Sequence, residues 1–131
     1  MGVVNQYATL ESFDAKKLDV FIQLGKDLNE DVLSEMLNTY FQTTDSTIFS
    51  FKSSAVEKDF HTIAHLAHKL KSSSGQLGLN RIHKMCSDLE NLIKSESAHL
   101  IEFQVNQLIK LIEEETVVTT NLLQDFLKAA A

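Results

Sequence analysis

The stretch that decides the fold runs from His61 to Leu79, with the sequence HTIAHLAHKLKSSSGQLGL. When it is wound as a helix at about 100° per residue, two faces separate. One face is apolar enough to enter a core, and it consists of Phe60, Ile63, Leu66, Ala67, Leu70, Ser74 and Leu77. The other face holds histidines, one cation and very small residues, namely His61, Ala64, His65, His68, Lys71, Ser72 and Gly75. The stretch therefore predicts an amphipathic helix with His68 exposed near its middle and with Leu66, Leu70 and Leu77 buried.

Small side chains surround His68 on the polar face. Ala64 lies one turn before it, Ser72 one turn after it and Gly75 two turns after it, so the imidazole stands open to a large, flat partner. A glycine inside a helix costs about 1 kcal/mol relative to alanine, and close approach of another molecule is one reason to keep Gly75. We interpret Ala64, His65 and Gly75 as positions where a partner docks.

Length and composition bound the fold class. The chain has 131 residues, which suits one domain with a single core. It has no proline and only four glycines, and it is rich in residues that favour helices. Strand-like runs bounded by turns are missing from the sequence. We therefore predict an all-α fold.

Charge and cysteine content exclude several classes of protein. The net charge of −6 argues against a nucleic-acid binder, which needs a basic surface. No apolar run reaches roughly 18 residues, and the first residues do not resemble a signal peptide, so we expect no membrane span. The single Cys86 lies in an apolar helical pattern, where we expect it in the core. A lone cysteine of this kind is consistent with a reducing cytoplasm, where we expect the protein.

The apolar pattern predicts four long helices and one short one. Residues 1–12 form an N-terminal arm, and residues 13–128 form one helical domain. Ser12 and Asn29 are the expected N-caps of the first two helices, Gly25 is the expected end of the first, and Asn80 is the expected cap of the fourth. The expected helices span residues 13–24, 30–53, 57–76, 81–94 and 98–128.

Short connections between amphipathic helices favour antiparallel neighbours. We therefore predict an up-down four-helix bundle with a short extra N-terminal helix across one end. In the last helix the predicted buried stripe includes Val118 and Leu122, and the acidic run at residues 113–115 is expected to be solvated.

The chain resembles the histidine-containing phosphotransfer (HPt) domains of multistep phosphorelays at residues 68–78. The family motif is approximately H-x-L-K-G-x-x-x-x-x-G, and His68, Leu70, Lys71 and Gly78 match it at their spacing. Ser72 stands in place of the usual first glycine, which exchanges one small residue for another. The predicted bundle also fits this family, whose reactive histidine lies midway along an exposed helix.

The resemblance implies a function and partners. A member of this family accepts a phosphoryl group from the aspartate of a receiver domain and passes it to another receiver. Response-regulator receiver domains and a hybrid sensor kinase are then the expected partners, with Mg²⁺ supplied by the receiver. We expect no cofactor of its own and a monomeric protein.

The residues themselves allow this chemistry. A neutral imidazole is a good nucleophile near pH 7, because the ordinary pKa of imidazole is about 6.5. Phosphoryl transfer depends on positioning and on offsetting oxygen charge, so we predict that Lys71, Ser72 and Gln76 stabilise the phosphoryl group on His68. The sequence contains no Walker-type phosphate loop, so we expect no autokinase activity.

Two other functions remain open from the sequence. One is a non-catalytic helical adaptor, a degenerate HPt domain that only docks a signalling partner. The other is a metal-binding bundle, because His61, His65 and His68 lie at i, i+4 and i+7 on one face. No acid shares their stripe and Lys71 would repel a cation, so we expect no metal and interpret His61 and His65 as docking residues or bystanders.

Overall fold

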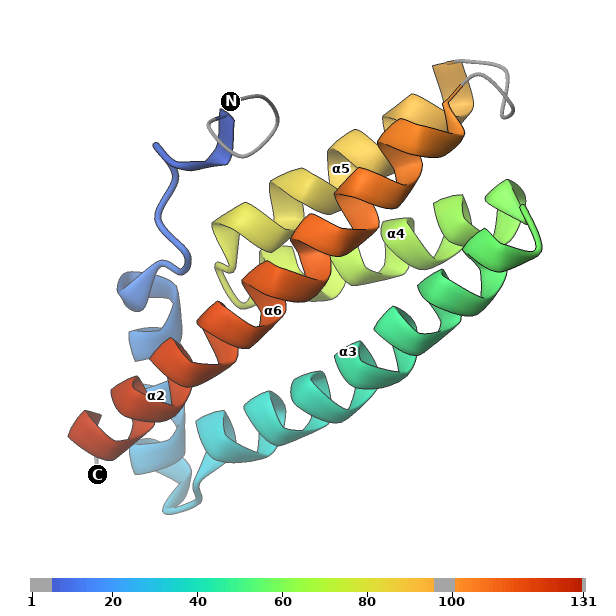
Figure 1. Cartoon of the computed structure of the whole chain (residues 1–131). Helices are drawn as coiled ribbons and strands as arrows, with labels where there is room; N and C mark the ends of the chain where they lie inside the picture. Colours follow the sequence, from blue (N-terminus) through green and yellow to red (C-terminus); the bar gives the residue numbers. More distant parts are fainter. Residues whose placement is uncertain (1–5, 96–100, 131) are drawn as a thin grey trace.

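The computed structural model describes residues 6–95 and 101–130 and is all-α over these residues, as predicted (Figure 1). Its long helices are α2 (Ala15–Leu28), α3 (Val32–Val56), α4 (Phe60–Gln76), α5 (Asn80–Ser95) and α6 (Glu102–Ala130). The predicted helices are thus all present, and the ends that can be compared differ from the prediction by a few residues; the predicted start of the last helix at residue 98 lies outside the described residues.

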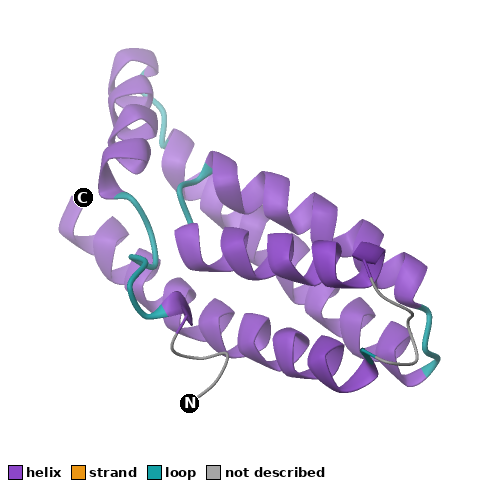
Figure 2. Cartoon of the chain, turned by 90° about the horizontal axis from the view of Figure 1, so that it is seen from above, coloured by secondary structure: helices purple, strands orange, loops and turns teal. Residues whose placement is uncertain are grey.

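The helices α3, α4, α5 and α6 form the predicted four-helix bundle. Each packs against the next, and α6 closes the ring by packing against α3. The short α2 packs against α3 at one end of the bundle (Figure 1, Figure 2). The core between the helices is lined mainly by leucine, isoleucine and phenylalanine side chains. No helix in the described ranges is long and apolar enough to cross a membrane.

Aspartates begin three of the helices, which corrects two of the predicted caps. The carboxylates of Asp14, Asp31 and Asp59 accept bonds from backbone N–H groups in the first turns of α2, α3 and α4. These bonds satisfy N–H groups that the helix itself leaves without a partner. The predicted caps Ser12 and Asn29 lie outside the helices that they were expected to begin.

The sequence predicted that Gly25 ends the first helix, and this prediction is wrong. The helix α2 continues to Leu28, and Asn29 ends it in the left-handed conformation with φ 56°. Gly25 is buried beneath the following turn. A Cβ at this position would lie only 2.5 Å from the carbonyl oxygen of Glu30, so a larger residue would clash with the turn. The glycine therefore permits the close approach of α2 to the loop that leads into α3.

The turn between α4 and α5 has the predicted glycine. Gly78 has φ +73°, a conformation that side-chain-bearing residues rarely adopt. Its carbonyl oxygen accepts a 2.8 Å bond from the backbone of Asp14, which ties the start of α2 to the end of α4. Asn80 is the first residue of α5 and not the cap before it, since the carbonyl of Leu79 already accepts a bond from the N–H of His83.

The described part of the N-terminal arm packs on the bundle. Tyr7 is buried in the core and donates a 2.6 Å hydrogen bond to Asp88 of α5. Burial and this carboxylate both raise the pKa of the Tyr7 hydroxyl. Arg81 donates to the backbone carbonyls of Leu10 and Ala8, so the first turn of α5 also fastens the arm.

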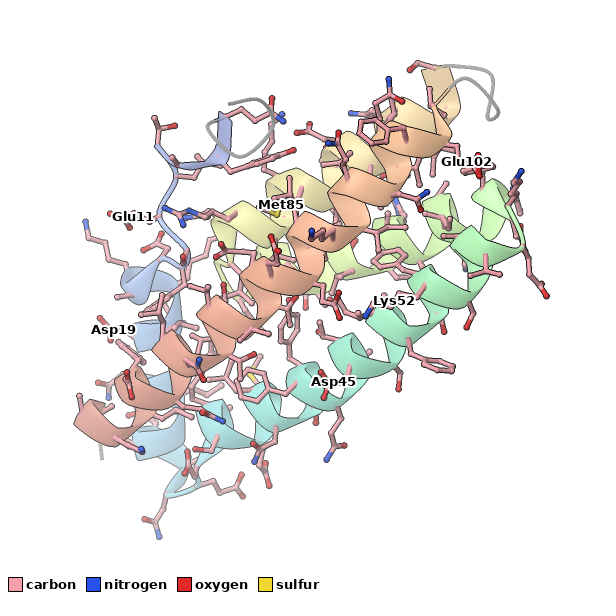
Figure 3. All side chains as sticks on the ribbon, viewed as in Figure 1. Glu11, Asp19, Asp45, Lys52, Met85 and Glu102 are labelled. Carbon is pink, nitrogen blue, oxygen red and sulfur yellow. The ribbon has the colours of Figure 1, made fainter. Side chains whose placement is uncertain are left out.

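The acidic run on α6 is only partly solvated, which corrects the prediction for residues 113–115. Glu115 is buried and accepts hydrogen bonds from Ser12 and Thr119, and Arg81 lies 3.6 Å away. Glu113, by contrast, faces Lys52 of α3, which extends toward α6 in Figure 3.

The buried stripe of α6 also differs from the prediction in its second half. Val118 and Leu122 are exposed, and the residues that face the core there are Thr116, Thr119 and Leu123. The prediction missed this stripe because two of its residues are threonines and not aliphatic residues. A threonine can be buried when its hydroxyl group donates to a nearby backbone carbonyl, as Thr116 does to Ile112.

Candidate functional site

His68 lies in the middle of α4 with a largely exposed side chain, as predicted. Its side chain is 58% exposed. The opposite face of α4 is held in the core by Ile63, Ala67 and Leu70, and by Ser74, which shares a 2.8 Å hydrogen bond with Tyr40 of α3. Leu77 is buried as predicted, whereas Leu66 is only partly buried at the edge of the core. The helix is therefore fixed by its apolar face and presents the imidazole to solvent.

A buried carboxylate on α5 holds one edge of the His68 ring. Glu90 is only 5% exposed in its side chain, and its Oε2 lies 3.0 Å from Nδ1 of His68. Its Oε1 accepts a 2.7 Å bond from Nζ of Lys71, and its Oε2 accepts a 2.8 Å bond from Nζ of Lys94. Glu90 thus joins a histidine and two lysines from two neighbouring helices.

The ammonium groups keep Glu90 ionised. The hydrogen bonds from Lys71 and then from Lys94 lower the pKa of the Glu90 carboxyl from 4.5 to about 2, against the opposing effect of burial. An ionised carboxylate only accepts hydrogen bonds. We therefore infer that Nδ1 of His68 carries a proton and donates a hydrogen bond to Glu90. In the neutral ring the lone pair is then on Nε2, the nitrogen on the other edge.

An open hollow lies beside His68, between the first half of α4 and the last turns of α5. It is lined by His61, Ala64, His65, His68, Glu90, Ile93 and Lys94. Lys71 does not line this hollow: its ammonium group reaches the other oxygen of Glu90, and its side chain is only 25% exposed. Ala64 and His65, two of the predicted docking residues, therefore lie beside His68 at the surface.

The structure gives Gly75 a further reason to be a glycine. A Cβ at this position would lie 2.9 Å from Nδ1 of His83 on α5. That nitrogen is hydrogen-bonded to the carbonyl oxygen of Lys71 at 2.9 Å. Gly75 thus permits close contact between α4 and α5 within the chain. Its contact with a partner stays a prediction.

The two other predicted phosphate-stabilising residues, Ser72 and Gln76, are exposed on α4. Ser72 lies one turn after His68. Gln76 lines a different groove, which it shares with Met36, Thr39 and Thr43 of α3. A contact between either side chain and a phosphoryl group on His68 stays a prediction.

Glu90 and Lys94 were missed by the sequence reasoning. Their spacing of i, i+4 is that of a helical ion pair, and Glu90 lies one turn after the buried Cys86. The sequence did contain a signal for this pair: Glu90 lies at the spacing of the buried residues of α5, and Lys94 follows it one turn later. Cys86 itself is in the core as predicted, where burial raises the pKa of its thiol.

Metal binding finds no geometric support in residues 6–95 and 101–130. No group of three or more histidine, cysteine, aspartate or glutamate side chains within these ranges is arranged so that it could hold a metal ion. The i, i+4, i+7 spacing of His61, His65 and His68 therefore does not bring the three imidazoles together around one point.

Comparison with known proteins gives the family. The family model described as Hpt domain matches residues 35–117, well over half of the chain. The match begins in α3, ends in α6 and contains His68, Lys71, Glu90 and Lys94. The chain is also similar to Multistep phosphorelay regulator 1 of Schizosaccharomyces pombe, with 27% identity over 78 residues. These residues are 60% of this chain and 26% of that protein, so the chain spans about a quarter of the length of this relative. The family match and the exposed histidine on a bundle helix agree, and the chain belongs to the Hpt domain family.

Proposed function

We propose that the chain is a phosphorelay intermediate that accepts a phosphoryl group from a receiver-domain aspartate onto His68 and passes it to another receiver domain. One observation carries the proposal. His68 is exposed on a fixed helix, and the bond from its Nδ1 to an ionised Glu90 leaves Nε2 free for attack. The family match and the phosphorelay name of the yeast relative support the same role.

The proposed step is an in-line displacement at phosphorus. The lone pair on Nε2 of His68 forms the new N–P bond, and the bond between phosphorus and the donor's aspartyl oxygen breaks. That electron pair leaves with the oxygen and regenerates the donor's carboxylate. The ring then carries a proton on Nδ1 and the phosphoryl group on Nε2, so it bears one positive charge. The return step onto a second receiver aspartate reverses these changes.

Glu90 is well placed to assist both directions. The positive charge that develops on the ring during attack lies 3.0 Å from the carboxylate, which stabilises it electrostatically. The same hydrogen bond fixes the ring so that Nε2 faces outward, which removes part of the entropic barrier to transfer. We propose that Glu90 is a positioning residue for His68.

The remaining residues have supporting roles in this proposal. Lys71 holds Glu90 in place and, one turn from His68, offsets negative charge on the phosphoryl group. Ser72 and Gln76 donate hydrogen bonds from the exposed face of α4. Ala64 lets the receiver surface come close to the ring. Mg²⁺ and the rest of the catalytic apparatus come from the receiver domain.

The test uses a purified receiver domain that carries a radiolabelled aspartyl phosphate. We expect the label to move to the chain and to form a bond that is labile in acid and stable in base. Replacement of His68 by Gln should abolish the transfer, whereas replacement of the exposed neighbour His65 by Gln should leave a phosphorylated chain. Phosphorus NMR should place the group on Nε2. Equal labelling of the wild type and the His68→Gln variant would refute the proposal, and a chain that binds the receiver without accepting label would instead be an adaptor.

A further inference from the structure

The hollow beside His68 contains a cation that the family motif does not include. Among the described residues that line the hollow, Lys94 carries the one ammonium group. It comes from the last turn of α5, so it faces His68 from the neighbouring helix. A phosphoryl group on the outward edge of His68 would lie next to this hollow.

The two lysines at Glu90 differ in their freedom to move. Lys71 binds Oε1, and its side chain is only 25% exposed, so most of it is enclosed beside α5. Lys94 binds Oε2, the same oxygen that faces His68, and its side chain is 65% exposed. The Glu90 carboxylate is buried, but the side chain of Lys94 is largely exposed, so Lys94 regains contacts with water when it leaves Glu90. Lys94 can therefore leave Glu90 at a smaller cost than Lys71, which is the better anchor.

This inference rests on the proposed function of His68. We propose that Lys94 binds the phosphoryl group directly once His68 is phosphorylated, by moving from Oε2 of Glu90 to a phosphoryl oxygen, while Lys71 stays on Oε1.

The electrostatics of the site favour this exchange. A phosphoryl group on nitrogen places about two negative charges beside the Glu90 carboxylate, and like charges at this distance repel. Lys94 is drawn to the group of higher charge density, with which it forms a charge-assisted hydrogen bond. Because Lys71 remains bound to Glu90, the exchange does not leave a buried carboxylate without a cation.

The first experiment measures the fraction of label on His68 at equilibrium with a phosphorylated receiver domain. Lys94→Met keeps the aliphatic stem and removes the charge, and it should lower the equilibrium constant for phosphorylation of His68 by about tenfold, as expected for the loss of one charge-assisted hydrogen bond. The lifetime of the phosphohistidine should fall as well. Lys94→Arg, which keeps the charge, should retain most of the wild-type equilibrium constant.

Lys84→Met is the matched control. Lys84 is on the same helix, pairs with an acid four residues later and is 56% exposed, but that acid is Asp88 and not Glu90. Its replacement changes the net charge by the same amount and should leave the equilibrium within twofold of the wild type. An equal effect of Lys94→Met and Lys84→Met would overturn the proposal.

A double-mutant cycle separates direct contact from neutralisation of Glu90. In Glu90→Gln the carboxylate charge is gone, so a lysine that only neutralised Glu90 would have no further effect. We expect Lys94→Met to lower the equilibrium constant about tenfold in this background too, and no effect there would overturn direct contact. A wild-type chain that accepts no label at all would refute the proposed function, and this inference with it. If the wild type accepts label but Lys94→Met leaves the equilibrium constant unchanged, only the inference about Lys94 is refuted.

Discussion

Removal of the Glu90 carboxylate is the most informative perturbation of the site, and its effect on stability can be worked out from three contacts. In Glu90→Ala the hydrogen bond from the exposed Lys94 to the buried carboxylate is lost, at about 0.5 kcal/mol for an i, i+4 pair. The largely buried side chain of Lys71 loses a partner worth about 1.5 kcal/mol, and the exposed ring of His68 loses a hydrogen bond worth about 0.5 kcal/mol.

Two gains oppose these losses. Alanine is a better helix former than glutamate by about 0.4 kcal/mol, and the unfavourable desolvation of a carboxylate disappears. The net loss of unfolding free energy should be about 1–2 kcal/mol, which lowers the melting temperature by about 4–8 °C in a domain of this size. Glu113→Ala, at an exposed pair on α6, is the control and should lower it by much less.

The effect on transfer should be larger than the effect on stability. Without Glu90 the ring of His68 can rotate and can carry its proton on either nitrogen, so phosphoryl transfer should slow by roughly tenfold to a hundredfold. Glu90→Gln retains an amide oxygen that can accept a hydrogen bond from Nδ1 but lacks the negative charge. Its transfer rate should lie between those of the wild type and Glu90→Ala.

Rapid-quench measurement of transfer from a phosphorylated receiver domain gives these rates, and circular dichroism gives the melting temperatures. A transfer rate of Glu90→Ala equal to that of the wild type at saturating receiver concentration would refute a positioning role for Glu90. Equally slow transfer by Glu90→Ala and Glu90→Gln would show that the geometry of the hydrogen bond contributes nothing.

Three further predictions concern the same helices. Because the pKa of Glu90 is about 2 in the folded chain and about 4.5 when unfolded, its ionisation stabilises the fold above pH 4.5, and the stabilisation should be lost as the pH falls toward 2. The difference in unfolding free energy between wild type and Glu90→Gln, measured by urea titration, should therefore be constant above about pH 5.5 and shrink below it. Lys71→Ala should keep the fold, slow transfer and shorten the phosphohistidine lifetime; unchanged rates and lifetimes would show that Lys71 has no role in transfer. Gly75→Ala should gain about 1 kcal/mol of helix propensity but lose the bond from His83 to the carbonyl of Lys71, so its melting temperature should barely change. In a His83→Ala background the same change should raise the melting temperature by about 4 °C, and equal shifts in both backgrounds would contradict the contact.

The pattern around His68 could be predicted from the sequence because one helix contains all of it. The spacing of Ile63, Ala67 and Leu70 determines which side of α4 is buried, and His68 must then lie on the opposite side. This inference needs no knowledge of the neighbouring helices. The exposed histidine, the bundle and the turn at Gly78 were therefore all predictable from local periodicity and residue type.

The parts of the site that come from other elements could not be predicted in the same way. Glu90 and Glu115 are both acids, and isolated acids are expected at the surface because burial of a charge is unfavourable. Each is buried because cations or hydroxyl groups from other segments surround it: Lys71 of α4 contacts Glu90, and Ser12 of the arm contacts Glu115. Local patterns in the sequence do not show which segments will pack against one another. For the same reason the role of Gly25 could not be predicted, because its close neighbour is the carbonyl of Glu30 in the next loop.

The balance of charge at Glu90 indicates which state of the site is electrostatically favoured. In the structure two ammonium groups surround one carboxylate, so the three side chains together carry one excess positive charge. Phosphorylation of His68 would add about two negative charges on the phosphoryl group and one positive charge on the ring. The site would then be close to neutral, so the excess positive charge of the free chain offsets the charge that phosphorylation adds. An arrangement of this kind favours arrival of the phosphoryl group without trapping it, because the Glu90 carboxylate that stabilises the ring cation also repels the phosphoryl oxygens. The proposed function, in which one histidine both accepts and releases the group, requires both of these opposed effects.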